Sequence, residues 1–242
     1  MPGRDPTPSS SSQPSLNLQR ERIRPPTPAA FFLYGAVLVH NQLNMPYTLA
    51  IVAMILGYTW VADPLVDVPG PWVLLPVVIV IALSIAHNRK SRDWGVSGRA
   101  FVPALLWSIA LTVPLVAALW VIGHAMGPAP IRRAPLLDFL YVMVWGGAQQ
   151  FVLQTVILRE SQAVAGRGAV LVAAAVFASL HLPNPFLVIV TFVGGLAWCW
   201  IYSRAPNMLP LAVSHAAATV AIQMSFNPAV TNALRTGWRY FQ

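Results

Sequence analysis

Charged residues are scarce in this chain, at 9% of its 242 positions. A soluble domain carries about a quarter charged residues, so water is not the solvent for most of this surface. Hydrophobic residues make up 57%, and the composition predicts an integral membrane protein with the lipid bilayer around it. Cysteine is almost absent as well, since Cys199 is the only one. A disulfide or a cysteine metal cluster within one chain is therefore excluded.

Several sequence patterns are also missing. The chain has no heptad, no solenoid repeat, no glycine-rich phosphate loop and no alternation typical of a transmembrane barrel strand. Its net charge of +8 comes from basic residues spread over short loops, whereas a nucleic-acid-binding face needs them clustered. We therefore expect an all-α domain and no nucleic-acid partner.

The apolar residues fall into seven segments, at residues 29–61, 72–86, 101–126, 137–158, 169–181, 186–202 and 208–224. Because about 20 residues of helix cross the hydrocarbon core, we predict a polytopic bundle of about seven spans, within a range of six to eight. The first segment is too long for one perpendicular helix and is interrupted by His40, Asn41, Gln42 and Pro46. It forms either an interfacial helix followed by a span or two short spans.

Residues 1–28 are rich in proline and serine, a composition that cannot bury a core. We predict a disordered tail there, a membrane domain over residues 29–226 and a short C-terminal tail over residues 227–242. If the first apolar segment crosses once, eleven basic residues lie on the side of the N-terminus and four on the other. The positive-inside rule then predicts a cytoplasmic N-terminus, and we expect a bacterial plasma membrane.

Three glutamines interrupt the segment at residues 137–158. Gln150 and Gln154 are four residues apart and share one helix face, while Gln149 is turned from it by about 100°. A polar group in lipid costs several kcal/mol unless it finds a partner. These amides either tie helices together by hydrogen bonds or belong to a site.

Two histidines lie in later apolar segments. His181 precedes Pro183, so we expect it where the backbone turns. His215 lies well inside the last segment and shares a helix face with Thr219, four residues on. A single intramembrane histidine can be structural, but two are costly without a purpose, and with the glutamines they indicate a joint site.

Glu160 is the only glutamate beyond the N-terminal tail. It follows Arg159 at an expected cytoplasmic helix end. This position favours a solvated local ion pair between the two, apart from any site.

The order and spacing of the polar groups resemble the CPBP family, the intramembrane proteases related to the CAAX prenyl protease Rce and to bacteriocin-processing proteins. Its hallmarks are Glu-Glu-x-x-x-Arg, then Phe-x-x-x-His, then His-x-x-x-Asn or a similar small polar residue. Here the second motif is intact from Phe177 to His181, and the third runs from His215 to Thr219. The resemblance covers about residues 88–224.

The first motif survives only in outline, as Gln149-Gln150-x-x-x-Gln154. In the family the first glutamate is thought to activate water for attack on a peptide bond, and the histidines orient that water, bind a metal or stabilise the oxyanion. A carboxamide takes up no proton near neutral pH, so His181 or His215 must be the base if hydrolysis survives. The concerted change is coherent, because losing both carboxylates would leave a buried arginine unpaired.

The resemblance thus implies a catalytic site made of Gln149, Gln150, Gln154, His181, His215 and Thr219. Since catalytic zinc normally has three protein ligands, we predict no tightly bound zinc and no other cofactor. The implied function is an endopeptidase acting on a membrane-embedded or lipid-linked peptide or protein. One alternative is a catalytically silent relative that binds such a partner in the same cavity. A small transporter is a third reading, but the inverted repeat typical of transporters is missing.

Overall fold

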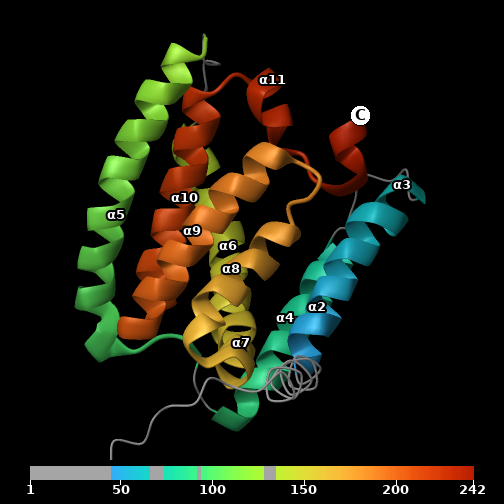
Figure 1. Cartoon of the computed structure of the whole chain (residues 1–242), viewed down its shortest axis with the longest axis vertical. Coiled ribbons are helices and arrows are strands. Elements are labelled where there is room, and N and C mark those ends of the chain that lie inside the picture. The colour runs from blue at the N-terminus through green and yellow to red at the C-terminus, as the bar shows by residue number, and fades with distance from the viewer. Residues whose placement is uncertain (1–44, 66–73, 92–93, 128–134) are drawn as a thin grey trace, which may run out of the picture. The chain divides into compact units, whose positions relative to one another are not determined.

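Every named element in the described part of the chain is helical. The computed structural model describes residues 45–65, 74–91, 94–127 and 135–242, so the predicted tail of residues 1–28 lies outside the described residues. In chain order (Figure 1) the first elements are α2 (Pro46–Gly57), η1 (Tyr58–Ala62), α3 (Asp63–Leu65), α4 (Leu74–Ser91) and α5 (Gly98–Ala125). They are followed by α6 (Pro135–Val152), η3 (Leu153–Ile157), α7 (Leu158–Ala165), η4 (Gly166–Gly168), α8 (Ala169–Ser179), α9 (Pro185–Arg204) and α10 (Met208–Ser225).

Five helical stretches are long and apolar enough to cross a membrane: Pro46–Leu65, Gly98–Ala125, Leu136–Ser179, Pro185–Arg204 and Met208–Ser225. A further apolar helix, Leu75–Arg89, is shorter. The described parts of the seven predicted segments overlap these stretches, because the segment at residues 137–158 and residues 169–179 of the next segment both lie within Leu136–Ser179. The predicted all-α transmembrane class is confirmed, and the chain is an integral membrane protein.

Local sequence explains where the last two long helices begin. Asn184 precedes α9, and its side-chain oxygen accepts a hydrogen bond from the Leu187 amide at 3.1 Å. Pro185 occupies the first helical position, where its missing N–H costs nothing. Asn207 caps α10 in the same way, accepting from the Leu209 amide at 3.1 Å. Both helices therefore start at fixed residues, immediately after short turns.

The π-helical segment η3 lies at the centre of the packing. All five of its residues are buried, and it contacts α2, α4, α8 and α9. The surrounding core includes Ile51, Phe177, Cys199 and Leu211. Helix α10 packs against both α5 and α6. The stretch that carries the three glutamines is therefore held on several sides by apolar residues.

The C-terminal segment, residues 227–242, was expected to be a short tail and contains three short helices: α11 (Pro228–Thr231), η5 (Asn232–Leu234) and η6 (Gly237–Phe241). The Gly237 amide donates a hydrogen bond to the Leu182 carbonyl at 2.9 Å. The Arg239 guanidinium donates two to the Asp63 carboxylate, at 2.6 and 2.7 Å. The segment thus ties the loop after α8 to the end of the α2 stretch, and Figure 1 shows the C-terminus beside α3.

Candidate functional site

His181 and His215 lie on two sides of Phe177. His181 follows α8 in the turn before α9, and its ring meets Phe177 edge to face with centroids 5.0 Å apart. His215 comes from α10 and meets Phe177 at 6.2 Å. It also stacks on Trp198 of α9, with centroids 4.6 Å apart. Residues from three helices and one turn therefore place the two imidazoles.

Hydrogen bonds set a different tautomer in each histidine. The Phe177 carbonyl lies 2.9 Å from His181 Nδ1, and a carbonyl can only accept, so Nδ1 carries the proton and the lone pair is at Nε2. The Gln150 amide nitrogen lies 3.3 Å from His215 Nδ1. An amide nitrogen donates, so in His215 the proton is at Nε2. One ring can accept a proton at Nε2, and the other can donate a hydrogen bond there.

Burial lowers the pKa of His181 below its ordinary value, although the hydrogen bond with Phe177 acts in the opposite direction. The ring is therefore neutral near pH 7. A neutral imidazole with a lone pair at Nε2 is the form that a general base requires.

A cavity of about 660 Å³ opens between these helices. Gln149, His181, His215 and Thr219 line it. Most other lining residues are apolar, among them Leu111, Tyr141, Trp145, Phe177, Val190 and Trp198. No aspartate or glutamate is among the described residues that line it. Four of the six predicted site residues therefore share one largely apolar chamber.

Gln150 and Gln154 lie behind this cavity rather than in it. Both side chains are 0% exposed. The Gln154 amide donates to the Gln150 carboxamide oxygen at 2.9 Å, and Gln150 in turn contacts His215. These two glutamines therefore orient His215, whereas Gln149 faces the cavity, as its 100° rotation along the helix allows.

Gly146 lets α6 come close to His215. A Cβ atom at this position would lie 3.3 Å from His215 Cγ, which is tighter than ordinary van der Waals contact. The glycine therefore belongs to the site through its missing side chain. The sequence analysis did not predict a role for Gly146, and the pair Gly146-Gly147 before the glutamines is the sequence signal that could have indicated this close approach.

Two consecutive hydrogen bonds hold Trp198 against His215. The Trp198 indole N–H donates to Ser214 Oγ at 3.0 Å, and Ser214 Oγ lies 2.6 Å from Thr112 Oγ1 of α5. Thr112 and Trp198 were not predicted, because their partners are distant in sequence. A buried indole usually needs such an acceptor, and these bonds fix the ring on which His215 stacks.

The donor set at the cavity does not fit a catalytic zinc ion. Catalytic zinc normally has three protein ligands from histidine, cysteine or carboxylate, and here the two histidines are accompanied by a carboxamide and a hydroxyl. Among the described residues no group of three or more such ligands comes together. We assign no step to a metal, and the absence of a tightly bound cofactor stays a prediction.

Glu160 lies away from the cavity, and our expectation of a solvated ion pair with Arg159 was wrong. Its side chain is buried and caps α2, accepting from the Tyr47 amide at 3.2 Å and the Thr48 amide at 2.8 Å. His87 Nε2 lies 3.8 Å from the same carboxylate. A carboxylate at a helix N-terminus is favourable because it meets free N–H groups and the positive end of the helix dipole.

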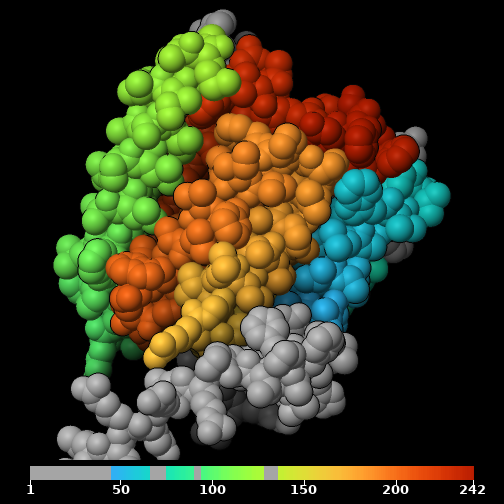
Figure 2. Space-filling view, viewed as in Figure 1, coloured from blue at the N-terminus to red at the C-terminus, as the bar shows by residue number. Residues whose placement is uncertain are grey.

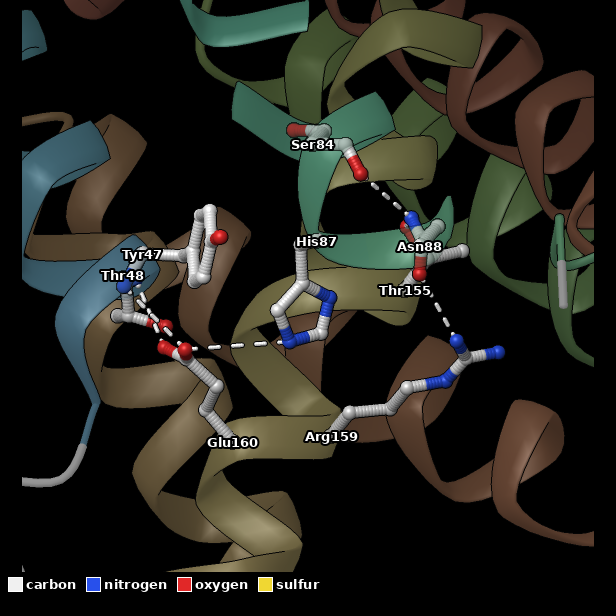
Figure 3. Close-up of polar contacts among 8 residues, drawn as sticks. All are labelled: Tyr47, Thr48, Ser84, His87, Asn88, Thr155, Arg159 and Glu160. Carbon is white, nitrogen blue, oxygen red and sulfur yellow. Dashed lines mark hydrogen bonds and ion pairs between the residues drawn. The ribbon is translucent and has the colours of Figure 1, made fainter. Parts of the chain in front are cut away.

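Arg159 points to different partners (Figure 3). It donates to Asn88 Oδ1 at 2.9 Å, and Asn88 Nδ2 donates to Thr155 Oγ1 at 2.8 Å and to the Ser84 carbonyl at 2.9 Å. The sequence could not indicate these pairings, since Asn88 is 71 residues from Arg159 and Thr48 is 112 residues from Glu160. The two neighbours thus anchor α7 to two separate helices.

The C-terminal segment also holds the turn that carries His181. Asn184 Nδ2 donates to the Thr231 carbonyl at 2.9 Å and to the Arg235 carbonyl at 3.0 Å. Leu234 and Thr236 line the cavity. The segment predicted as a tail therefore contributes to the wall of the site.

Replacing Gly237 with alanine should loosen this attachment. Gly237 has φ +57°, and a Cβ atom would lie 2.5 Å from the Thr59 carbonyl oxygen. We expect Gly237→Ala to lower the free energy of unfolding by about 1–3 kcal/mol, measured by thermal unfolding in detergent. Gly168→Ala is the matched control, because its Cβ would meet only ordinary contact at 3.8 Å. Equal stability of the two variants would contradict the close packing of Gly237.

These features define a class: a helical membrane protein whose spans enclose an apolar cavity with two histidines and a glutamine in its wall. Residues 134–221 match the model of the family described as Type II CAAX prenyl endopeptidase Rce1-like. The match includes all six predicted site residues, confirms the resemblance predicted from the motifs and supports a CAAX-protease-like fold for this part of the chain. No curated protein and no solved structure matched the chain.

Proposed function

We propose that this protein is an intramembrane endopeptidase that hydrolyses membrane-embedded or lipid-linked peptides with a histidine as general base. The observation that carries the proposal is the pair of complementary imidazoles at one cavity, one with a lone pair at Nε2 and the other with a proton there. The Rce1-like match of residues 134–221 supports the reaction class. The apolar lining suits a substrate that enters from lipid.

In the proposed reaction, His181 Nε2 takes a proton from a water molecule as the water oxygen attacks the scissile carbonyl. The carbonyl carbon becomes tetrahedral, and His215 Nε2–H donates a hydrogen bond to its oxyanion. The imidazolium of His181 then gives the proton to the leaving amine, which breaks the C–N bond. Gln149 holds the water or the carbonyl by hydrogen bonds. Gln150 and Gln154 act as positioning residues through His215.

A catalytically silent role is the second candidate. The observation that favours it is the absence of any acidic side chain among the described residues of the cavity wall. In this role the chamber binds a lipid-linked or transmembrane partner without cleaving it. In either role, we propose that the protein resides in a bacterial plasma membrane with its N-terminus in the cytoplasm.

The test is cleavage of co-expressed membrane-associated substrates, detected by mass spectrometry of the products. The panel should contain single-span proteins and lipid-linked peptides. His181→Ala and His215→Ala should each lower turnover, His181→Ala by about 10²-fold or more since a general base is lost. Because the pKa of His181 is lowered, native turnover should persist into mildly acidic pH and fall only when the ring becomes protonated.

His124→Ala is the control for this test. His124 is exposed near the end of α5, so its loss removes a histidine without touching the cavity, and turnover should stay at the native level. Equal turnover in all three variants would reject the histidine mechanism. Folded protein with no cleavage by the native chain would support the silent role.

A further inference from the structure

A second hollow lies on the outer side of the helices, between α5 and α9. This groove has a volume of about 250 Å³ and is lined by Trp107, Ala110, Leu111, Ala197, Trp200 and Ile201. The rings of Trp107 and Trp200 meet edge to face with centroids 5.1 Å apart. Trp107 is 48% exposed on the protein surface. Because α5 is long and apolar enough to span the bilayer, this exposed surface contacts lipid. The groove therefore faces hydrocarbon rather than the protein core.

The positively charged side chain of Arg204 lies at one end of the groove. The Arg204 guanidinium carbon lies 4.0 Å from the centre of the Trp200 ring, and the side chain is exposed at the last position of α9. In such a stack the ring covers a face of the guanidinium, while its N–H donors lie in the guanidinium plane and point outward. Arg204 can therefore still bind an anion.

Arg99 stands at the same end. The start of α5 is tied to the end of α9, since the Ser97 amide donates to the Pro206 carbonyl at 3.2 Å and Asn207 Nδ2 donates to the Ser97 carbonyl at 2.9 Å. Arg99 is exposed two residues after Ser97. Neither α5 nor α9 contains an aspartate or glutamate. The two helices thus carry only positive charge where they meet. Figure 2 shows them side by side towards the lower left.

We propose that this groove binds one anionic phospholipid, with its phosphate at Arg204 and Arg99 and an acyl chain along Trp107 and Trp200. The guanidinium fork matches the geometry of phosphate oxygens. Tryptophan and arginine side chains are typical of the membrane interface, where lipid headgroups meet hydrocarbon. The tryptophan pair and the adjacent cations therefore suit a lipid that lies across this boundary. The groove shares Leu111 and Ala197 with the wall of the histidine cavity but contains neither histidine nor Gln149, so the proposal does not rest on the proposed protease activity.

Competition between lipids in nanodiscs tests the proposal. The full chain is reconstituted with equal amounts of phosphatidylglycerol and phosphatidylcholine, and native mass spectrometry measures the lipid that stays bound. The native protein should retain phosphatidylglycerol preferentially. The double variant Arg99→Gln with Arg204→Gln should lower this retention about tenfold, because each surface cation attracts anionic lipid.

Ala110→Phe is a second, independent variant. It fills the groove without changing charge, and it should lower retention of phosphatidylglycerol to a similar degree. Arg167→Gln is the matched control, because Arg167 is an exposed arginine in η4 and lies outside the groove. It should retain lipid like the native protein.

Three outcomes would overturn the proposal. Equal retention of the two lipids by the native protein would mean unselective annular lipid only. An equal loss in Arg167→Gln would mean general attraction to a basic surface. Native retention in Ala110→Phe, with thermal unfolding unchanged, would show that the groove takes no acyl chain.

Discussion

Replacing Gln149 with glutamate is expected to raise peptide hydrolysis, and in a His181→Ala background the gain should reach about 10²- to 10⁴-fold, the usual contribution of a general base. Gln149 lines the cavity together with His181 and His215, so a carboxylate there would face the same water molecule. The resemblance to the CPBP family implies a glutamate at this position. The measurement is the rate of product formation from the co-expressed substrate panel, with native protein and variant at matched expression.

Gln150→Glu is the matched control, because it makes the same chemical change one residue along the helix. Gln150 is 0% exposed, bonded to Gln154 and behind the cavity wall. A carboxylate there would be buried without a cation, which destabilises the fold, and would give no gain in rate. Activation by Gln150→Glu but not by Gln149→Glu would show that the reacting water lies elsewhere.

Replacing Glu160 with alanine is expected to lower the free energy of unfolding by about 2–4 kcal/mol. The change removes two hydrogen bonds from a charged acceptor, each worth about 1.5–3 kcal/mol, and leaves the Tyr47 and Thr48 amides at the start of α2 without that partner. Water at the helix end recovers part of the loss. Thermal unfolding of the purified protein in detergent measures it.

Two further variants sharpen this prediction. Glu160→Gln keeps one acceptor oxygen and removes the charge, so it should lose about half as much stability. Gln162→Ala lies on the exposed side of the same helix and should change stability little. If Glu160→Ala unfolds at the temperature of Gln162→Ala, the carboxylate does not anchor α2.

The sequence predicted the helices well because lipid imposes a simple requirement: every backbone polar group must be bonded within its own segment. It also predicted the angular relation of the glutamines. Gln150 and Gln154 share a face and are hydrogen-bonded to each other, while Gln149 is turned away from them. The sequence did not indicate that the two faces have separate roles, with one in the cavity and one supporting His215.

Other features depended on contacts between distant parts of the chain. Thr112 and Trp198 reach Ser214 from two other helices, and Glu160 reaches α2, so neither arrangement leaves a periodic signal. Residues 227–242 follow the last apolar segment, and we predicted only a short tail there. Their helices form because the segment packs on the His181 turn and the end of the α2 stretch.

The π-helical segment η3 lies between α6 and α7. It sets the direction in which the side chains of α7 point, relative to those of α6, around the helix axis. Each residue of an α-helix advances the direction of its side chain by about 100°, and a π-helical turn contains one more residue than an α-helical turn. The extra residue within Leu153–Ile157 lets Gln150 point to His215 while Glu160 points to α2. A one-residue deletion there would turn all of α7 about its axis, so the site and the α2 anchor depend on the same local register.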